Sequence, residues 1–407
     1  MRDDLQRLDS WKPPDQWNEI VRRTPGEPSP EPSPGGSRLV AALVATAVAV
    51  VGLGFGFLQL GGLSDDEGPS PREPVEVQHL VTSERPIDTG LRFPEGVVVG
   101  EGAVWVAARY ANQEGGDLLR LDPSTGEEQA RIPMPSLPGW TVGGAGITTG
   151  LGSVWIAAGG SEGHTPAALY MIDPSSSSLA ATIDVGPGSP ADVWVDASGI
   201  WVLSFSRGNM PMYLYKLDPV SHEVTATTEV PASWSQNVFA AGGWIYVWGS
   251  TGGTAPAETL FKVDPATAKI VDSTQPGDGN EFSIVASGDR IWFFHDGLRA
   301  LDGATGEQVV GPLRDFSVDW CCSGLIADGR GGVWVTSKEK DEPASLWHLD
   351  LNGHVTASSG PALSREADGI AAAYDEDTMS VWFVHYKDTI LRLGLEVRSE
   401  LDLASVP

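Results

Sequence analysis

The sequence predicts an all-β fold, a seven-bladed β-propeller of four-stranded antiparallel blades, preceded by a single transmembrane helix and a short cytoplasmic tail. Three observations support this expectation: a repeated phrase, a regular spacing between its copies, and one long apolar run near the N-terminus. A fixed period of roughly 40–50 residues, with several short strands in each unit, is the signature of a propeller.

The repeated phrase joins a strand ending in Val-Trp-Val to a second strand that runs into an Asp-Pro-x-Thr-Gly turn. Its first copy is GAVWVAARYANQEGGDLLRLDPSTGE, from Gly102 to Glu127. Seven copies can be aligned on the aromatic anchors Trp105, Trp155, Trp201, Tyr246, Trp292, Trp334 and Trp382. Consecutive anchors are separated by 50, 46, 45, 46, 42 and 48 residues.

Both parts of the phrase fit a propeller blade. A sheet that is packed on both faces needs inner strands that are continuously apolar, as in AVWVAA and SVWIAA. In the turn, Asp122 accepts a backbone hydrogen bond, Pro123 presets φ, and Gly126 takes the left-handed position. We therefore interpret the turn as the hairpin between the third and fourth strands, not as a metal-binding loop.

The chain has 407 residues and a formal net charge of −28. The first 38 residues carry six basic and seven acidic groups, so almost the whole imbalance lies beyond them. An acidic field of this size argues against nucleic acid and anionic lipid surfaces as ligands of the propeller.

Residues 1–37 are expected to form a cytoplasmic tail, partly helical and partly disordered. Its apolar side chains, among them Trp11, Trp17, Ile20 and Val21, either have no role or fold onto a cytoplasmic partner of residues 1–23. The Pro-rich stretch from Thr24 to Ser37 is typical of an extended spacer.

Residues 38–61 are predicted to be a transmembrane signal anchor. Leu39 to Leu60 is 22 residues long and uncharged, enough to cross a hydrocarbon core of ~30 Å. It exceeds the apolar run of a cleaved signal peptide, which is about 7–15 residues. Arginines precede the span and acidic residues follow it, which places the N-terminus in the cytoplasm and the C-terminal part outside.

Residues 62–74 are a polar linker, and residues 75–407 are assigned to the extracytoplasmic propeller. The segment Val75 to Pro86 resembles the fourth-strand segments of the repeats. We expect it to pair beside the C-terminal strands and complete the last blade, because joining the two chain ends removes an exposed edge.

Ligand recognition is expected on the loops that join one blade to the next. These connections carry three tryptophans outside the repeat phase, Trp140, Trp234 and Trp320. They form a ligand rim, or each fills the space between two blades. The adjacent Cys321 and Cys322, also on this face, either form a strained disulfide or remain reduced as small apolar residues.

Sequence motifs identify no reaction. His295 and Glu281 fall within one blade and could serve as an acid/base pair or hold a divalent cation. A histidine in a solvated loop is the alternative. We find no metal-ligand spacing and no phosphate loop, and we expect no cofactor.

The repeat unit G-x-V-W-V … L-x-x-[LIV]-D-P-x-T-G resembles the YncE-like and virginiamycin B lyase-like group of bacterial seven-bladed propellers, over about 310 residues. In the lyases a catalytic His acts with a Mg²⁺-supporting Glu, and here Trp292-Phe293-Phe294-His295 is similar to that motif. The N-terminal layout, with PPDQWNEIVRR from Pro13 to Arg23, resembles actinobacterial membrane proteins of the anti-sigma-factor-like kind.

These observations favour a membrane-anchored module whose propeller binds a ligand or protein outside the cell, with inward signalling through the tail as an option. The alternative is an extracytoplasmic lyase or hydrolase that uses His295 and Glu281. A third interpretation is a structural spacer in an envelope complex.

Overall fold

The structure is a computed structural model of the 407-residue chain. It describes residues 77–90, 94–109, 116–135, 146–158, 167–186, 188–205, 212–232, 234–251, 257–276, 283–316, 324–337, 343–363, 371–385 and 389–398. All of them belong to the compact unit Glu73–Pro407. The predicted tail, transmembrane helix and linker lie outside the described residues. Within these ranges, no helix is long and apolar enough to cross a membrane.

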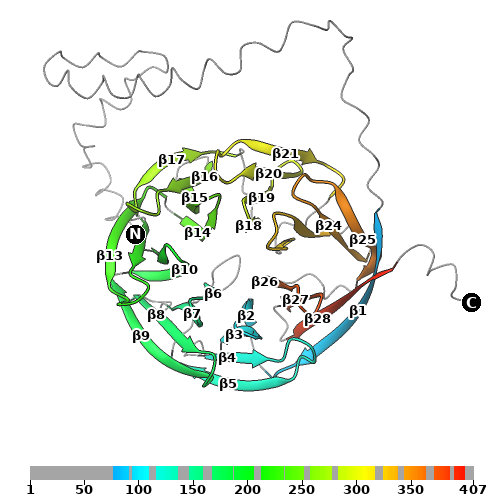
Figure 1. Ribbon diagram of the computed structural model, residues 1–407, viewed down its shortest axis with the longest axis horizontal. Helices are drawn as coiled ribbons and strands as arrows, with labels where there is room; N and C mark the ends of the chain where they lie inside the picture. The colour runs from blue at the N-terminus through cyan, green and yellow to red at the C-terminus, as the bar shows by residue number, and fades with distance from the viewer. Residues whose placement is uncertain are drawn as a thin grey trace, which may run out of the picture. The chain divides into compact units, whose positions relative to one another are not determined.

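The described chain is all-β, as predicted, and its strands form several four-stranded antiparallel sheets arranged around a centre as in a β-propeller (Figure 1). The strands nearest the centre are β2 (Pro94–Gly100), β6 (Ile147–Gly150), β10 (Ser189–Asp196), β14 (Trp234–Ala241), β18 (Ile284–Ser287), β22 (Leu325–Ala327) and β26 (Ala371–Asp375). The second strands are β3 (Ala103–Arg109), β7 (Ser153–Ala158), β11 (Gly199–Phe205), β15 (Trp244–Thr251), β19 (Arg290–Phe294), β23 (Val333–Ser337) and β27 (Ser380–His385).

Two further sets complete the sheets. The third strands are β4 (Gly116–Leu121), β8 (Ala167–Asp173), β12 (Met212–Leu217), β16 (Ala257–Val263), β20 (Leu298–Asp302), β24 (Ala344–Leu349) and β28 (Thr389–Arg398). The outer strands are β5 (Glu128–Met134), β9 (Ser178–Gly186), β13 (Val224–Val230), β17 (Ile270–Thr274), β21 (Gln308–Leu313), β25 (Val355–Leu363) and β1 (Gln78–Asp88).

The inner strands contact one another in chain order. β2 contacts β6, β6 contacts β10, and the series continues through β14, β18, β22 and β26 back to β2. Backbones come very close in this inner ring. A Cβ atom added at Gly100 would lie 2.2 Å from the Thr149 hydroxyl of the next sheet, so only glycine fits there.

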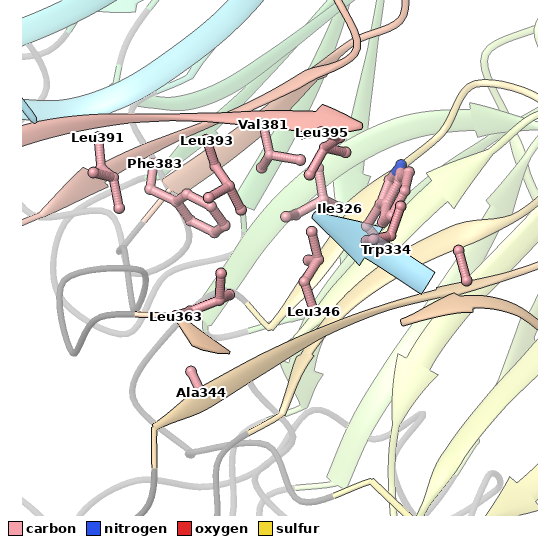
Figure 2. Packing of buried hydrophobic residues seen from close by; sticks show 12 residues of the cluster. Ile326, Trp334, Ala344, Leu346, Leu363, Val381, Phe383, Leu391, Leu393 and Leu395 are labelled. Carbon is pink, nitrogen blue, oxygen red and sulfur yellow. The ribbon is translucent and has the colours of Figure 1, made fainter. Parts of the chain in front are cut away.

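The second strands are buried, as the apolar phrase predicts. Val104, Trp105 and Val106 each have 0% of their surface exposed. Side chains of alternate residues pack against the sheet on either side, so every core cluster is shared between two neighbouring sheets. Figure 2 shows one such cluster, in which Val381, Phe383 and Leu393 face Leu346 and Trp334 across the space between two sheets.

The Asp-Pro-x-Thr-Gly segment is the predicted hairpin turn between a third and a fourth strand. Asp122 accepts backbone hydrogen bonds from Ser124 (2.9 Å) and Thr125 (2.8 Å), and Gly126 has φ of 71°. The hydrogen bond from Thr125 lowers the pKa of Asp122 most strongly, and the one from Ser124 lowers it further. Burial opposes part of this shift, so the net pKa is lowered. The carboxylate holds its own turn, so its role is structural.

The N-terminal strand β1 completes the last sheet, as expected. It pairs antiparallel with β28 over ten residues, from His79 opposite Arg398 to Asp88 opposite Thr389. It also pairs in parallel with β25 of the preceding sheet through Gln78 and His79. One eight-stranded sheet results, in the order β22-β23-β24-β25-β1-β28-β27-β26. The first and last described strands are therefore joined edge to edge.

Candidate functional site

The sheets have two ends, which we name by their connections. The turn face holds the tight turns from first to second strands and from third to fourth strands, such as Glu101–Gly102 and residues 122–127. The entry face is the opposite end, where inner strands begin and second strands end. The antiparallel register places Pro94, Ala108, Gly116 and Met134 at this end. Variable loops on a rigid scaffold make the entry face the natural place to look for a site.

Most of the sequence-predicted site residues lie outside the described residues: Trp140, Glu281, Trp320, Cys321 and Cys322. Their proposed roles stay predictions. Trp234 is the first residue of β14, so its backbone belongs to an inner strand at the entry face and not to the preceding connection.

His295 lies in the short entry-face turn between β19 and β20. Its backbone N–H donates to the Gly297 carbonyl (2.9 Å), and its carbonyl accepts a hydrogen bond from Arg299 Nε (2.8 Å). These bonds fix the backbone of the turn. The structure does not bring His295 together with Glu281, because Glu281 is not described.

An ionisable group that no sequence motif singled out lies near the entry end of β10. The Asp192 carboxylate accepts the Val193 N–H (2.9 Å) and the Val238 N–H of β14 in the next sheet (2.8 Å). It follows an irregularity in the register between Pro190 and Asp192. Gly146, just before β6, comes so close that a Cβ there would lie 2.7 Å from the Asp192 Cα. Three consecutive sheets therefore meet at this residue.

Burial raises the pKa of the Asp192 carboxyl to about 7, and the two backbone hydrogen bonds only partly oppose the shift. No charged side chain is among the causes of this shift. A carboxyl that titrates near neutral pH can exchange a proton or attract a cationic group under physiological conditions. The signal in the sequence was an aspartate inside the apolar inner strand SPADVWV.

A second polar cluster lies on the turn face, between the sheets of β18 and β22. Asp328 Oδ1 accepts the Ser287 hydroxyl (2.8 Å) and the backbone N–H groups of Arg330 (2.7 Å) and Gly332 (2.9 Å). His348 Nε2 lies 3.0 Å from Asp328 Oδ2, and His348 Nδ1 lies 2.6 Å from the Thr356 hydroxyl. Burial raises the pKa of Asp328, but the hydrogen bonds from these donors outweigh it and the net pKa is lowered.

This cluster contains Ser, His and Asp but not a catalytic triad. A triad needs the histidine to take the proton from the serine hydroxyl. Here the carboxylate stands between the two, and the Ser287 hydroxyl donates to Asp328 while it accepts the Gly329 and Gly331 N–H groups (both 3.1 Å). The network therefore joins two sheets and has no activated nucleophile.

Trp334 borders this network and differs from the other anchors. Its ring centroid lies 4.5 Å from that of His348 and 5.4 Å from that of Tyr374. The indole N–H is buried and has no hydrogen-bond partner within the described chain. In contrast, Trp105 donates to Gly100 O (3.1 Å) and Trp292 to Gly331 O (2.8 Å). Figure 2 shows Trp334 at the edge of its cluster, beside Ile326 and Leu395.

The structure is similar to solved β-propellers. A chain in a crystal structure of the mitotic checkpoint complex has a TM-score of 0.53 at 9% sequence identity, covering 83% of this chain and 97% of that one. A chain of the hydrazine synthase of Kuenenia stuttgartiensis has a TM-score of 0.56 at 11% identity, covering 77% and 97%. No family model and no curated protein matches the sequence. At these identities the likeness shows the fold alone, a β-propeller.

Proposed function

We propose that this chain is a membrane-anchored, seven-bladed propeller that binds a ligand or protein partner outside the cell. The seven sequence repeats and the closed order of contacts among the inner strands support the blade count. The apolar segment 38–61 and its flanking charges support the anchor and its orientation. The repeat phrase supports a YncE-like or virginiamycin B lyase-like relationship.

The binding site of this proposal is the entry face around β10 and β14. The observation that carries it is Asp192, an ionisable carboxyl with a pKa near 7 that is hydrogen-bonded to β14, the strand that begins with Trp234. An ionisable group on a rigid scaffold suits a ligand with a cationic part, and the tryptophans predicted for this face suit an apolar part of the same ligand. The other rim residues predicted from the sequence are Trp140, Trp320, Cys321 and Cys322.

Site-specific photo-crosslinking in intact cells tests this site. A benzophenone amino acid at position 234 is expected to give a defined adduct. The control is the same amino acid at Val220, whose side chain is 86% exposed in a turn on the opposite face. Adducts at both positions, or only at 220, would contradict an entry-face site.

Inward signalling forms a separable part of the proposal. A peptide of residues 1–37 is expected to bind one cytoplasmic protein, with contacts from Trp11, Trp17, Ile20 and Val21. Trp17→Ala should abolish that binding. Equal binding by the parent and variant peptides would contradict inward signalling and leave the propeller site of the proposal unaffected.

Protease treatment of sealed cells tests the topology, because an extracytoplasmic propeller is cleaved without lysis.

A lyase or hydrolase is the second proposal, favoured by the place of His295 in an entry-face turn. It requires a divalent cation held with Glu281. Calorimetric titration of the full chain with Mg²⁺ should then give saturable binding that is lost in Glu281→Ala. Binding that is identical in the variant, or absent in the parent, contradicts it.

A further inference from the structure

Exposed apolar side chains gather at one end of the sheets, the turn face. Within the described ranges, each large hydrophobic residue that is exposed belongs to a turn of this face or lies within two residues of a strand end there. These residues are Val77, Leu151, Val220, Val224, Val271, Val309, Leu351 and Val397.

The opposite ends of the outer strands differ. Val224 begins β13 with 40% of its surface exposed, whereas Val230, which ends that strand at the entry face, has 0%. Met134 and Val185, at the entry ends of β5 and β9, are buried as well. A single exposed apolar residue needs no explanation, but confinement to one end of the strands is a property of a face.

Leu151 is the least expected of these residues. It lies in the turn between β6 and β7 with φ of 55°, followed by Gly152 with φ of 73°. Such hairpin turns favour Asn, Asp or Gly, because a leucine is strained in the left-handed region. Leu151 is nevertheless 48% exposed, so burial does not offset the strain. The same turn in the sheet of β2 carries the polar Glu101.

Val220, which is 86% exposed, lies close to the same junction between sheets. The His222 ring of its turn packs edge-on against Trp155, with 5.5 Å between the centroids, and the Trp155 indole donates to the Gly150 carbonyl (2.9 Å). Because Gly150 precedes Leu151, the two apolar turns flank one junction. The other turns carry small or polar residues at the position of Val220: Ser124, Ser175, Ala266, Ala304 and Asn352.

The chain enters the propeller at this face. β1 begins at Gln78, and the next residue, His79, lies opposite Arg398 at the turn-face end of β28. Residues 62–76 separate this point from the anchor proposed at 38–61. Their length spans at most about 50 Å, and about 20 Å as a flexible coil. Such an anchor keeps the turn-face end of β1 close to the bilayer surface.

We propose that the turn face docks on the outer surface of the membrane, with Leu151 and Val220 inserted among the lipid headgroups. The inference rests on the anchor and topology proposed above. A weak contact is sufficient, because the effective concentration of a module on a short linker is on the order of millimolar. In this orientation the entry face points away from the bilayer, which leaves its site open to a ligand or partner.

The contact is apolar and not electrostatic. Almost all of the negative charge of the chain lies beyond its first 38 residues, so an anionic lipid surface repels the propeller. Two cations at the turn face already have acceptors, since Arg120 Nη1 donates to the Pro174 carbonyl (2.7 Å) and Lys216 Nζ to the Pro265 carbonyl (2.6 Å). Docking should therefore be stronger on a zwitterionic membrane than on an anionic one at low salt.

The test is photo-crosslinking of the full chain, reconstituted in phosphatidylcholine vesicles. A benzophenone amino acid replaces Val224, and mass spectrometry counts adducts that carry one phospholipid. The double variant Leu151→Asn with Val220→Ser should lower their yield at least fivefold. Glu101→Asn, the control, changes the same turn of another sheet and should leave the yield unchanged. Asparagine suits the left-handed position, so the melting temperature of the double variant should equal or exceed that of the parent.

Equal adduct yields in the parent and the double variant overturn the inference, and so does a second copy of the chain as the main adduct. A yield that rises when phosphatidylglycerol replaces phosphatidylcholine contradicts an apolar contact. A chain that does not float with the vesicles contradicts the anchor, and docking with it. A chain that floats but gives no phospholipid adduct contradicts docking alone. Phospholipid adducts are also expected at position 220, and their mass separates them from the ligand or protein adducts that test the entry-face site.

Discussion

Asp328 and Asp192 both link neighbouring sheets, but the pKa of one is lowered and that of the other is raised to about 7. Asp328 has the Ser287 hydroxyl, two backbone N–H groups and His348 as partners. Asp192 has only two backbone N–H groups. Asp192 is also the more deeply buried of the two, so deeper burial and fewer donors together raise its pKa. The comparison separates a structural carboxylate on the turn face from a titratable one on the entry face.

The largest effect is expected for Asp328→Ala. It leaves the Ser287 hydroxyl and the N–H groups of Arg330 and Gly332 without an acceptor in a half-buried site. We expect the free energy of unfolding at pH 7 to fall by about 3 kcal/mol. Urea denaturation measures it, with Asp315→Ala, an exposed aspartate, as the control. Equal small losses in both variants would show that the network does not hold the sheets together.

The pH dependence of the same variant has a defined sign. The folded-state pKa of Asp328 is below its unfolded value, so its contribution is present above about pH 4 and is lost as the pH falls through the folded pKa. The difference between parent and Asp328→Ala should therefore be constant from pH 6 to 8 and shrink below pH 4. A difference that grows in acid would contradict the lowered pKa.

A smaller loss, about 1–2 kcal/mol, is expected for Ser287→Ala. This change removes one donor to Asp328 and the acceptor of two backbone N–H groups, but leaves the carboxylate and His348 in contact. Thermal unfolding at pH 7 measures the loss. A cost as large as that of Asp328→Ala would mean that the hydroxyl, not the carboxylate, organises the turn.

The smallest effect has the opposite sign. Because the folded-state pKa of Asp192 is raised, its contribution to stability is present at low pH and is lost as the pH rises through about 7. Asp192→Asn removes this titration and keeps one carbonyl acceptor. The variant should be more stable than the parent by about 1 kcal/mol at pH 8 and lose that advantage by pH 5. A pH-independent difference would show that Asp192 does not titrate in this range.

The elements of the fold could be predicted because their signals are local. The Val-Trp-Val strands, the aspartate turns and the closing role of residues 75–86 each depend on a few neighbouring residues or on the spacing of the copies. Asp192 could not be assigned in this way, because its second donor is 46 residues away on another sheet. Asp328 likewise depends on Ser287, 41 residues earlier.

The pairing of β1 with β28 also has a consequence during protein synthesis. Of the strands that the structure describes, β1 leaves the ribosome first and finds its partner last, because 319 residues separate His79 from Arg398. At about 5–20 residues per second, β1 waits roughly 15 to 60 s with an open edge. The sequence of β1 is polar and largely exposed, and it includes Glu84, Arg85 and Pro86. Charged residues and proline discourage pairing with other nascent chains, so the open edge is protected while β1 waits for β28.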